Sequence, residues 1–332
     1  MSRRHESGSA LALVLWVVAV LLIISLSFSV LIQSRVRRME MLFNRFQASL
    51  EAYSGLQYGL LVFLTGTKGP TEITFANRTD LTDSNRYYLD GTPVSVPLFE
   101  KKTRLSLQDY SGLVSLRRFY PEFLDGLMKY FGASEENRRA FVDSLLDWID
   151  LDDLIRLNGA EKDYYETLGY RPRNSPLMTL DEILLIRGMD ESLYPKIQPF
   201  LILGNSDGIN PNVAPFEVLM SFPHMTEDAA RKIMEFRKTG FLAGVSALSS
   251  VSGINFSFYE RAITFVNSSS VILKASCGFG DNSRYMIVCH LRRRTGVSTN
   301  FLEVFGDSTK GLPVEFSRWR PYDITLWKEE VR

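Results

Sequence analysis

The chain has 332 residues, which by length alone is enough for about two domains. Its 38 Lys and Arg residues balance 38 Asp and Glu residues, and this zero net charge argues against partners held by bulk electrostatics, such as nucleic acid. Two cysteines are too few for a disulfide scaffold or a four-thiolate zinc site. No phosphate-binding loop, dinucleotide fingerprint or hydrolase elbow is present, so we do not expect an enzyme.

A long apolar segment lies near the N terminus. Residues 9–32 carry no charge, and as a helix these 24 residues would span about 36 Å, against a hydrocarbon core of about 30 Å. Because no proline occurs before Pro70, the sequence predicts one helix over roughly 9–64 with its first half in a membrane. A buried core helix is the alternative, but it needs protein around every face. The second half carries an apolar stripe for partner helices, made of Phe43, Phe46, Leu50, Tyr53 and Leu60.

The remaining chain changes from a β pattern to a helical one and back. β-prone segments between 66 and 107, separated by turn residues, are TEITF, NRYYL, PVSVPLF and KTRLSLQDY. Apolar spacing then predicts helices over 119–131, 135–149, 179–187, 190–203, 214–221 and 226–239, with N-caps at Ser134, Thr179 and Thr226. Strand patterns return in AITFVN, SVILKAS, YMIVCHLRRR and NFLEVFG. Helices between two β regions indicate an insertion into an α/β domain.

An acidic run begins at the end of the helix predicted over 135–149. Around Asn158 and Gly159 lie six carboxylates within 17 residues, namely Asp147, Asp150, Asp152, Asp153, Glu161 and Asp163. An oxygen-rich loop with a turn glycine suits calcium, which takes six to eight oxygen ligands. The spacing is not that of an EF-hand, and no histidine lies near to complete a zinc or hydrolase site. The alternative is that residues 150–153 cap a helix end and face water.

Residues 209–248 resemble a helix-hairpin-helix module, which grips nucleic-acid phosphates through backbone N–H groups in a glycine-containing hairpin. Here the hairpin reads Phe222-Pro223-His224-Met225-Thr226, without glycine. The basic residues nearby are matched by acidic ones. We therefore expect the helical scaffold without the phosphate grip, and no nucleic acid as partner.

The two cysteines lie on predicted neighbouring strands. If the hairpin between them is centred near Ser283, Cys277 and Cys289 oppose one another and could form a disulfide in an oxidising compartment. A shift of one residue in the turn centre would prevent this pairing. Two buried free cysteines are the equal alternative.

The first eight residues, MSRRHESG, form a short basic leader that ends in Gly8 directly before the apolar segment. This arrangement resembles type IV prepilin leaders, which a membrane peptidase removes after the glycine, on the cytoplasmic side. The resemblance implies a mature N terminus at Ser9. Pilins and pseudopilins usually carry glutamate at the fifth mature position, which here is Leu13. Within that family, absence of this carboxylate is characteristic of the K-type minor pseudopilin of type II secretion.

Three further segments resemble the K-type family in the family's own order. DWIDLDDLIRLNGAEKDYYETLGY, residues 147–170, is similar to its D-W-x-D-x-D run leading into G-A-E-x-x-Y-Y. Residues 174–201 match an N-x-P followed by a helix, and residues 208–238 are similar to I-N-x-N-x-A with its following helices. The family often has D-E-P-R-P where this chain has Asp153-Leu154-Ile155-Arg156-Leu157, which removes one potential acidic ligand.

The resemblance implies an α+β pseudopilin fold: a long N-terminal transmembrane and amphipathic helix packed on an antiparallel sheet, with a large all-helical insertion. The expected parts are a leader over 1–8, a transmembrane helix over 9–32, a periplasmic helix with the first β part over 33–107, an insertion over 108–262 that contains the helix-hairpin-helix-like region, and a second β part over 263–332. Calcium binding by the family's helical domain favours Asp150, Asp152 and Glu161 as ligands, with Asp153 and Asp163 as further candidates.

The implied function is assembly. Prepilin peptidase would remove residues 1–8 and methylate Ser9, leaving the chain in inner-membrane lipid with a cytoplasmic N terminus and a periplasmic globular part. The chain would join the I- and J-type minor pseudopilins at the tip of the pseudopilus, above the inner-membrane secretion platform. Leu13 fits the tip, because it cannot neutralise the N terminus of a subunit ahead of it. The alternatives are a single-pass, signal-anchored periplasmic binding or scaffold protein and a DNA-uptake factor.

Overall fold

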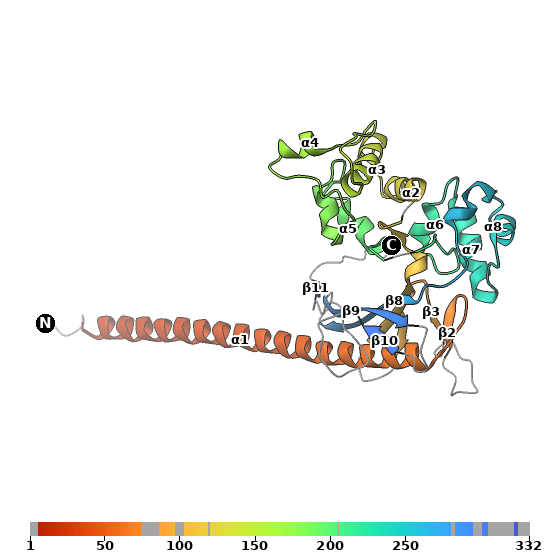
Figure 1. Ribbon diagram of the computed structural model, residues 1–332. Coiled ribbons are helices and arrows are strands. Elements are labelled where there is room, and N and C mark those ends of the chain that lie inside the picture. The colour runs from red at the N-terminus through yellow and green to blue at the C-terminus, as the bar shows by residue number, and fades with distance from the viewer. Residues whose placement is uncertain are drawn as a thin grey trace.

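The computed structural model describes residues 6–74, 86–96, 103–118, 120–204, 206–279, 283–294, 301–304 and 322–324. Its first element is helix α1, Glu6–Thr65, which confirms the prediction of one continuous helix. The first half of α1 projects far beyond the rest of the molecule (Figure 1). Its most apolar 18-residue window has a mean hydropathy of 2.9 and no buried share. The buried-core alternative is therefore wrong, and α1 is long and apolar enough to cross a membrane.

The second half of α1 lies along a six-stranded antiparallel sheet in the order β10-β9-β8-β5-β4, with β11 also pairing with β9 (Figure 1). The strands β5 and β8 are neighbours although 160 residues separate them, since Asp109 ends one and Ser270 begins the other. Everything between them is therefore an insertion in one antiparallel pair. The strands are β4 Val94–Val96, β5 Thr103–Asp109, β8 Ser270–Phe279, β9 Ser283–Arg294, β10 Phe301–Val304 and β11 Tyr322–Ile324.

Close contact between α1 and the sheet depends on small residues in the helix. A Cβ atom at Gly59 would lie 2.7 Å from the Cδ1 atoms of both Leu105 and Leu273, so the glycine leaves room for these leucine side chains against the helix. Leu56 on the same face is fully buried. A small antiparallel sheet follows the helix, made of β1 Thr67–Lys68, β2 Glu72–Thr74 and β3 Arg86–Tyr88.

The insertion has its own apolar core and lies on the side of the sheet away from α1 (Figure 1). Within it, β6 Val114–Ser115 pairs in parallel with β7 Leu201–Ile202. The helices are α2 Pro121–Tyr130, α3 Glu135–Ile149, α4 Lys162–Glu166, α5 Tyr194–Ile197, α6 Phe216–Met220, α7 Glu227–Thr239 and α8 Val245–Ser252. The 3-10 turns are η2 Tyr110–Gly112, η3 Leu180–Leu185, η4 Gln198–Phe200 and η5 Ser257–Ala262.

Several predicted elements of the insertion differ in the structure. The hydroxyls of Ser134 and Thr226 cap α3 and α7, and Thr179 forms a capping box with Glu182, as predicted. The helix predicted over 179–187 is instead a 3-10 turn. AITFVN, residues 262–267, is not a strand but makes a single bridge, from Ile263 to Ile209.

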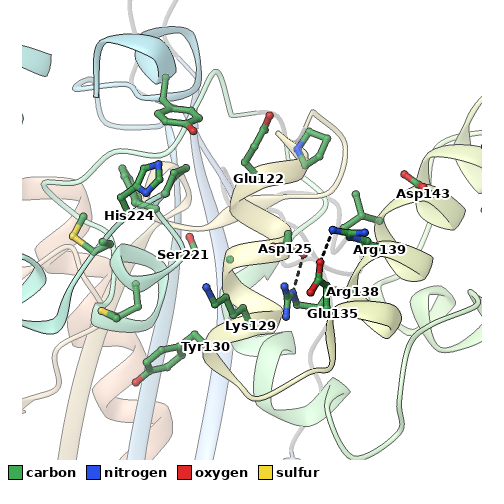
Figure 2. Close-up of a pocket in the computed structure, with 18 of the residues that line it drawn as sticks. Glu122, Asp125, Lys129, Tyr130, Glu135, Arg138, Arg139, Asp143, Ser221 and His224 are labelled. Carbon is green, nitrogen blue, oxygen red and sulfur yellow. Dashed lines mark hydrogen bonds and ion pairs between the residues drawn. The ribbon is translucent and has the colours of Figure 1, made fainter. Parts of the chain in front are cut away.

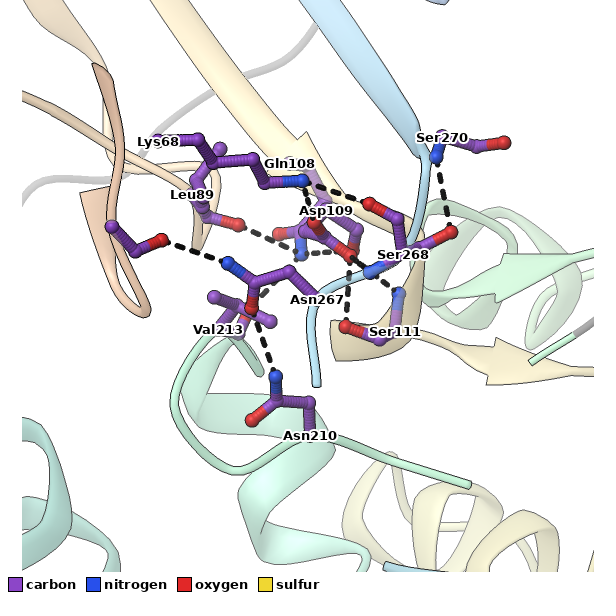
Figure 3. A network of polar contacts seen from close by, with 11 residues as sticks. Lys68, Leu89, Gln108, Asp109, Ser111, Asn210, Val213, Asn267, Ser268 and Ser270 are labelled. Atoms are coloured by element: carbon purple, nitrogen blue, oxygen red, sulfur yellow. Dashed lines mark hydrogen bonds and ion pairs between the residues drawn. The ribbon is translucent and has the colours of Figure 1, made fainter. Parts of the chain in front are cut away.

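The junction between the sheet and the insertion is polar and centred on Asp109, whose side chain is fully buried (Figure 3). Its Oδ2 atom accepts from Lys68 Nζ at 3.0 Å, and its Oδ1 atom accepts from the backbone N atoms of Ser111 and Ser268, each at 2.9 Å. One carboxylate therefore ties together the chain after α1, the exit from β5 and the return into β8. Asn210 Nδ2 extends the network by donating to Asn267 Oδ1.

Candidate functional site

The acidic run lies where α3 ends and the chain turns toward α4. The ring of Trp148, in the last turn of α3, packs edge-on against Tyr165 of α4, with 5.0 Å between centroids. Tyr165 is fully buried and also packs beside Tyr170. These aromatic contacts hold the two helices together, so the connection between them lies beside the carboxylates.

Asp147 and Asp150 share one cation, the guanidinium of Arg156. The Nη1 atom of Arg156 lies 2.5 Å from Asp147 Oδ1 and 2.6 Å from Asp150 Oδ2. Asp147 is fully buried and also accepts the backbone N–H of Arg156 through Oδ2. A Cβ atom at Gly159 would lie 1.9 Å from that same oxygen, so the glycine is needed for close approach to the carboxylate.

Glu161 is the second buried acid of the site, beside Asp147. It is 2% exposed, and neither of its carboxyl oxygens has a hydrogen-bond partner among the described residues. Burial raises its pKa to about 7, and the negative charges of Asp147, Asp150 and Asp153 add to this shift. In the same part of the structure, Asp150 Oδ1 and Asn174 Oδ1 are also buried without a hydrogen-bond partner.

The other predicted ligands lie at the surface. Asp152 Oδ1 accepts the backbone N–H of Leu154, and Asp153 Oδ1 accepts from Asn174 Nδ2 at 3.1 Å. Asp163 is exposed in the first turn of α4. In the described ranges no three His, Cys, Asp or Glu side chains form a group that could hold a metal as they stand. The five-residue ligand set therefore stays a prediction. Glu161 is buried, whereas Asp152, Asp153 and Asp163 are exposed.

The residues nevertheless fit a hard cation. Buried oxygens of Glu161, Asp150 and Asn174 have no partner among the described residues, and buried polar atoms of that kind are costly unless a donor or an ion serves them. Carboxylate and amide oxygens are the ligands that calcium takes. The sequence indicated the carboxylates, but it gave no sign that Asn174, 13 residues beyond Glu161, returns to them.

We expect Glu161→Gln to change stability in a pH-dependent way when no calcium is present. Glu161 is protonated in folded and unfolded chains below pH 4.5, but above it only the folded chain keeps the proton, up to about pH 7. The free energy of unfolding of the wild type should therefore decrease as the pH rises from 4.5 to about 7. The variant should be more stable than the wild type by about 2 kcal/mol at pH 8, but not at pH 4. Urea denaturation with a chelator at both pH values measures this, and equal stability at pH 8 contradicts it.

The processing residues lie at the start of α1. Gly8 and Ser9 are in its first turns, where the backbone is described but the side chains are not. Leu13 is exposed in the apolar half of the helix. Cleavage between Gly8 and Ser9 stays a prediction.

The partner stripe of α1 is present with one correction. Phe43, Phe46, Leu50 and Tyr53 are exposed on the helix, as expected of a surface for partner helices. Leu60 is only 7% exposed and belongs to the core between α1 and the sheet. Its assignment to the stripe is wrong, because α1 is covered by strands at this point.

The cysteines do not oppose one another. In the ladder between β8 and β9, Cys277 pairs with Tyr285, and Cys289 pairs with Leu273. Both thiols are buried and neither is part of a disulfide, and Cys277 Sγ donates to the buried Glu51 Oε2 at 3.0 Å. Of the two alternatives, the disulfide is therefore wrong, because the strand register places the cysteines four residues apart along the ladder.

A cavity of about 940 Å³ lies between α2, α3 and the turn that precedes α7 (Figure 2). Its charges are of both signs and partly paired, since Arg138 contacts Asp125 at 2.8 Å and Arg139 contacts Glu135. His224 at its edge has a φ of 62°, the left-handed geometry that glycine usually supplies in such a hairpin. Because the charges of both signs are balanced, this lining favours neither an anion nor a cation. It therefore does not form a phosphate-binding site.

The fold and these sites define a class: a pseudopilin fold whose antiparallel sheet carries a large helical insertion. Residues 105–205 match the family described as type II secretion system (T2SS), protein K. The fold is similar to a chain in the crystal structure of the GspK–GspI–GspJ complex from the enterotoxigenic Escherichia coli type 2 secretion system, with a TM-score of 0.52 and 15% identity over 81% of this chain and 97% of that one.

Curated relatives carry the same family name. The chain is 23% identical over 60% of its length to type II secretion system protein K of Pectobacterium carotovorum, and 33% identical over 25% of its length to that of Klebsiella pneumoniae. It spans 63% and 26% of the lengths of these relatives. The resemblance predicted from the sequence is confirmed: residues 105–205 match the protein K family of type II secretion systems, and the curated relatives carry that family's name.

Proposed function

We propose that the chain is a minor pseudopilin that assembles with I- and J-type partners at the tip of a type II secretion pseudopilus and supports protein export across the outer membrane. The similar solved chain comes from a complex of GspK, GspI and GspJ, which supports this choice of partners. The role is structural, without catalysis. The proposed location is the bacterial inner membrane, with a cytoplasmic N terminus and a periplasmic globular part.

The observation that carries the proposal is the division of α1. Its apolar half has no protein cover, whereas its second half packs against the sheet and keeps Phe43, Phe46 and Leu50 exposed. A helix of this kind can hold the chain in lipid and then lie beside the helices of other subunits. A periplasmic scaffold protein outside any filament would need the anchor but not the exposed stripe.

Calcium is the proposed structural ion, held by Glu161, Asp150 and Asn174 where buried oxygens lack partners. Asp152, Asp153 and Asp163 are exposed and belong to the outer part of this acidic surface. Bound there, calcium would supply the positive charge that Glu161 and its acidic neighbours lack. Its stabilising effect would fix the connection between α3 and α4.

Processing of the N terminus tests the proposal. We expect the full chain, expressed with prepilin peptidase and extracted from membranes, to begin at a methylated Ser9. Gly8→Leu should leave the leader in place, because the peptidase cuts after a small residue. N-terminal sequencing and intact mass check both results. An unprocessed wild-type chain that begins at Met1, or one cut beyond residue 32, favours the periplasmic scaffold protein.

A further inference from the structure

Arg156 is the central residue of the connection between α3 and α4. Its guanidinium lies at hydrogen-bond distance from both Asp147 and Asp150, and its own backbone N–H also donates to Asp147. The side chain of Arg156 is 38% exposed, whereas the side chain of Asp147 is fully buried. The arginine therefore reaches from the surface into a buried acidic site.

One guanidinium does not satisfy all the acidic oxygens of this site. Asp150 uses Oδ2 to accept from Arg156, but its Oδ1 atom is buried without a partner among the described residues. Both oxygens of Glu161 are also buried there without a partner. Arg156 thus neutralises part of the negative charge, and the remaining charge and oxygens still suit a divalent cation.

We propose that Arg156 is a built-in counter-cation, which competes with calcium for the negative charge of Asp147 and Asp150 and so sets the calcium affinity of this site. The inference rests on the calcium site of the proposed function. A divalent cation bound to these oxygens would lie close to the guanidinium, and like charges at that separation repel. Calcium binding therefore requires the guanidinium to leave the two carboxylates.

The apolar side chains next to Arg156 do not hold the connection in place. Leu154, Ile155 and Leu157 are all exposed, so the chain on either side of Arg156 lacks apolar anchors. Asn158 ends this exposed stretch, because its backbone N and Nδ2 atoms both donate to Asp143 Oδ2. Movement of Arg156 is thereby confined to a short stretch that includes Leu157, a residue that lines the cavity of Figure 2.

Calcium titration of the full chain in detergent, by calorimetry, tests the proposal. Arg156→Gln removes the competing charge and should bind calcium about tenfold more tightly than the wild type. Arg156→Lys keeps the charge and should stay close to the wild-type affinity. The matched control is Arg138→Gln, which also removes an arginine paired with an aspartate, Asp125, and should leave calcium affinity unchanged.

Thermal unfolding provides a second readout. Without calcium, Arg156→Gln should unfold at a lower temperature than the wild type, since Asp147 and Asp150 lose their cation. Calcium should then raise its unfolding temperature by more than it raises that of the wild type. If Arg156→Gln binds calcium and the wild type does not, this result also supports competition.

Two outcomes count against the proposal in different ways. If the wild type binds calcium and Arg156→Gln binds it equally or more weakly, competition is overturned and the calcium site stands. If neither chain binds calcium, the calcium site of the proposed function is overturned together with the competition.

Discussion

Replacing Asp109 by alanine is expected to lower the free energy of unfolding by about 3–5 kcal/mol. The carboxylate is fully buried and accepts from Lys68 Nζ and from the backbone N–H groups of Ser111 and Ser268. Its loss leaves these donors without their acceptor at the junction of sheet and insertion, and a buried donor without a partner is costly. Urea denaturation of the full chain in detergent, followed by circular dichroism, measures the change.

The matched control is Asp207→Ala. Asp207 also forms an ion pair, with Arg118 at 2.7 Å, but both side chains are largely exposed. An exposed pair of this kind contributes about 0–1 kcal/mol, so the control should unfold almost as the wild type does. Equal effects of the two substitutions would show that the Asp109 network does not hold the junction together.

We expect Gly126→Ala to destabilise the insertion by about 2 kcal/mol or more, although alanine is the better helix former by about 1 kcal/mol. Gly126 lies inside α2, and a Cβ atom there would be 2.2 Å from the backbone O atom of Ser221, next to α6. A carbonyl within a packed turn cannot move aside as a flexible side chain can. The steric cost should therefore exceed the gain in helix propensity.

Gly240→Ala is the comparison for Gly126→Ala. Gly240 has extended backbone, and a Cβ atom there would make only ordinary contact, at 3.4 Å or more from the Phe236 ring. Its effect should stay within about 0.5 kcal/mol. Thermal unfolding of both variants measures the difference. A Gly126→Ala chain as stable as the wild type would mean that α2 can move away from Ser221 without loss.

The sequence predicted the long and strongly periodic elements well. Helix α1 followed from an uninterrupted apolar segment without proline, and α3 and α7 from apolar spacing behind a capping hydroxyl. The pairing of β5 with β8 across the insertion agrees with the expected order of elements, a β region, helices and a second β region. Such features depend on local composition, which the sequence states directly.

The missed features depend on tertiary contacts. The short helix α8 has the serine-rich sequence VSALSSVS, which carries no strong helical signal. Leu60 has the spacing of the exposed stripe but lies under the sheet, and the cysteine register depends on the hairpin connection. At the acidic site, the carboxylates were visible in the sequence. The folding of Arg156 onto Asp147 and the burial of Glu161 were not, because they depend on the path of the connection.

The most direct measurement for the central claim is co-purification of the full chain with its I- and J-type partners, expressed together and extracted in detergent. We predict one complex that contains all three chains. Replacing the exposed Phe43 and Phe46 with serine should weaken it without unfolding the chain, because neither side chain belongs to the core. A chain that elutes alone, both with calcium and with a chelator, would contradict assignment as a minor pseudopilin of the tip complex.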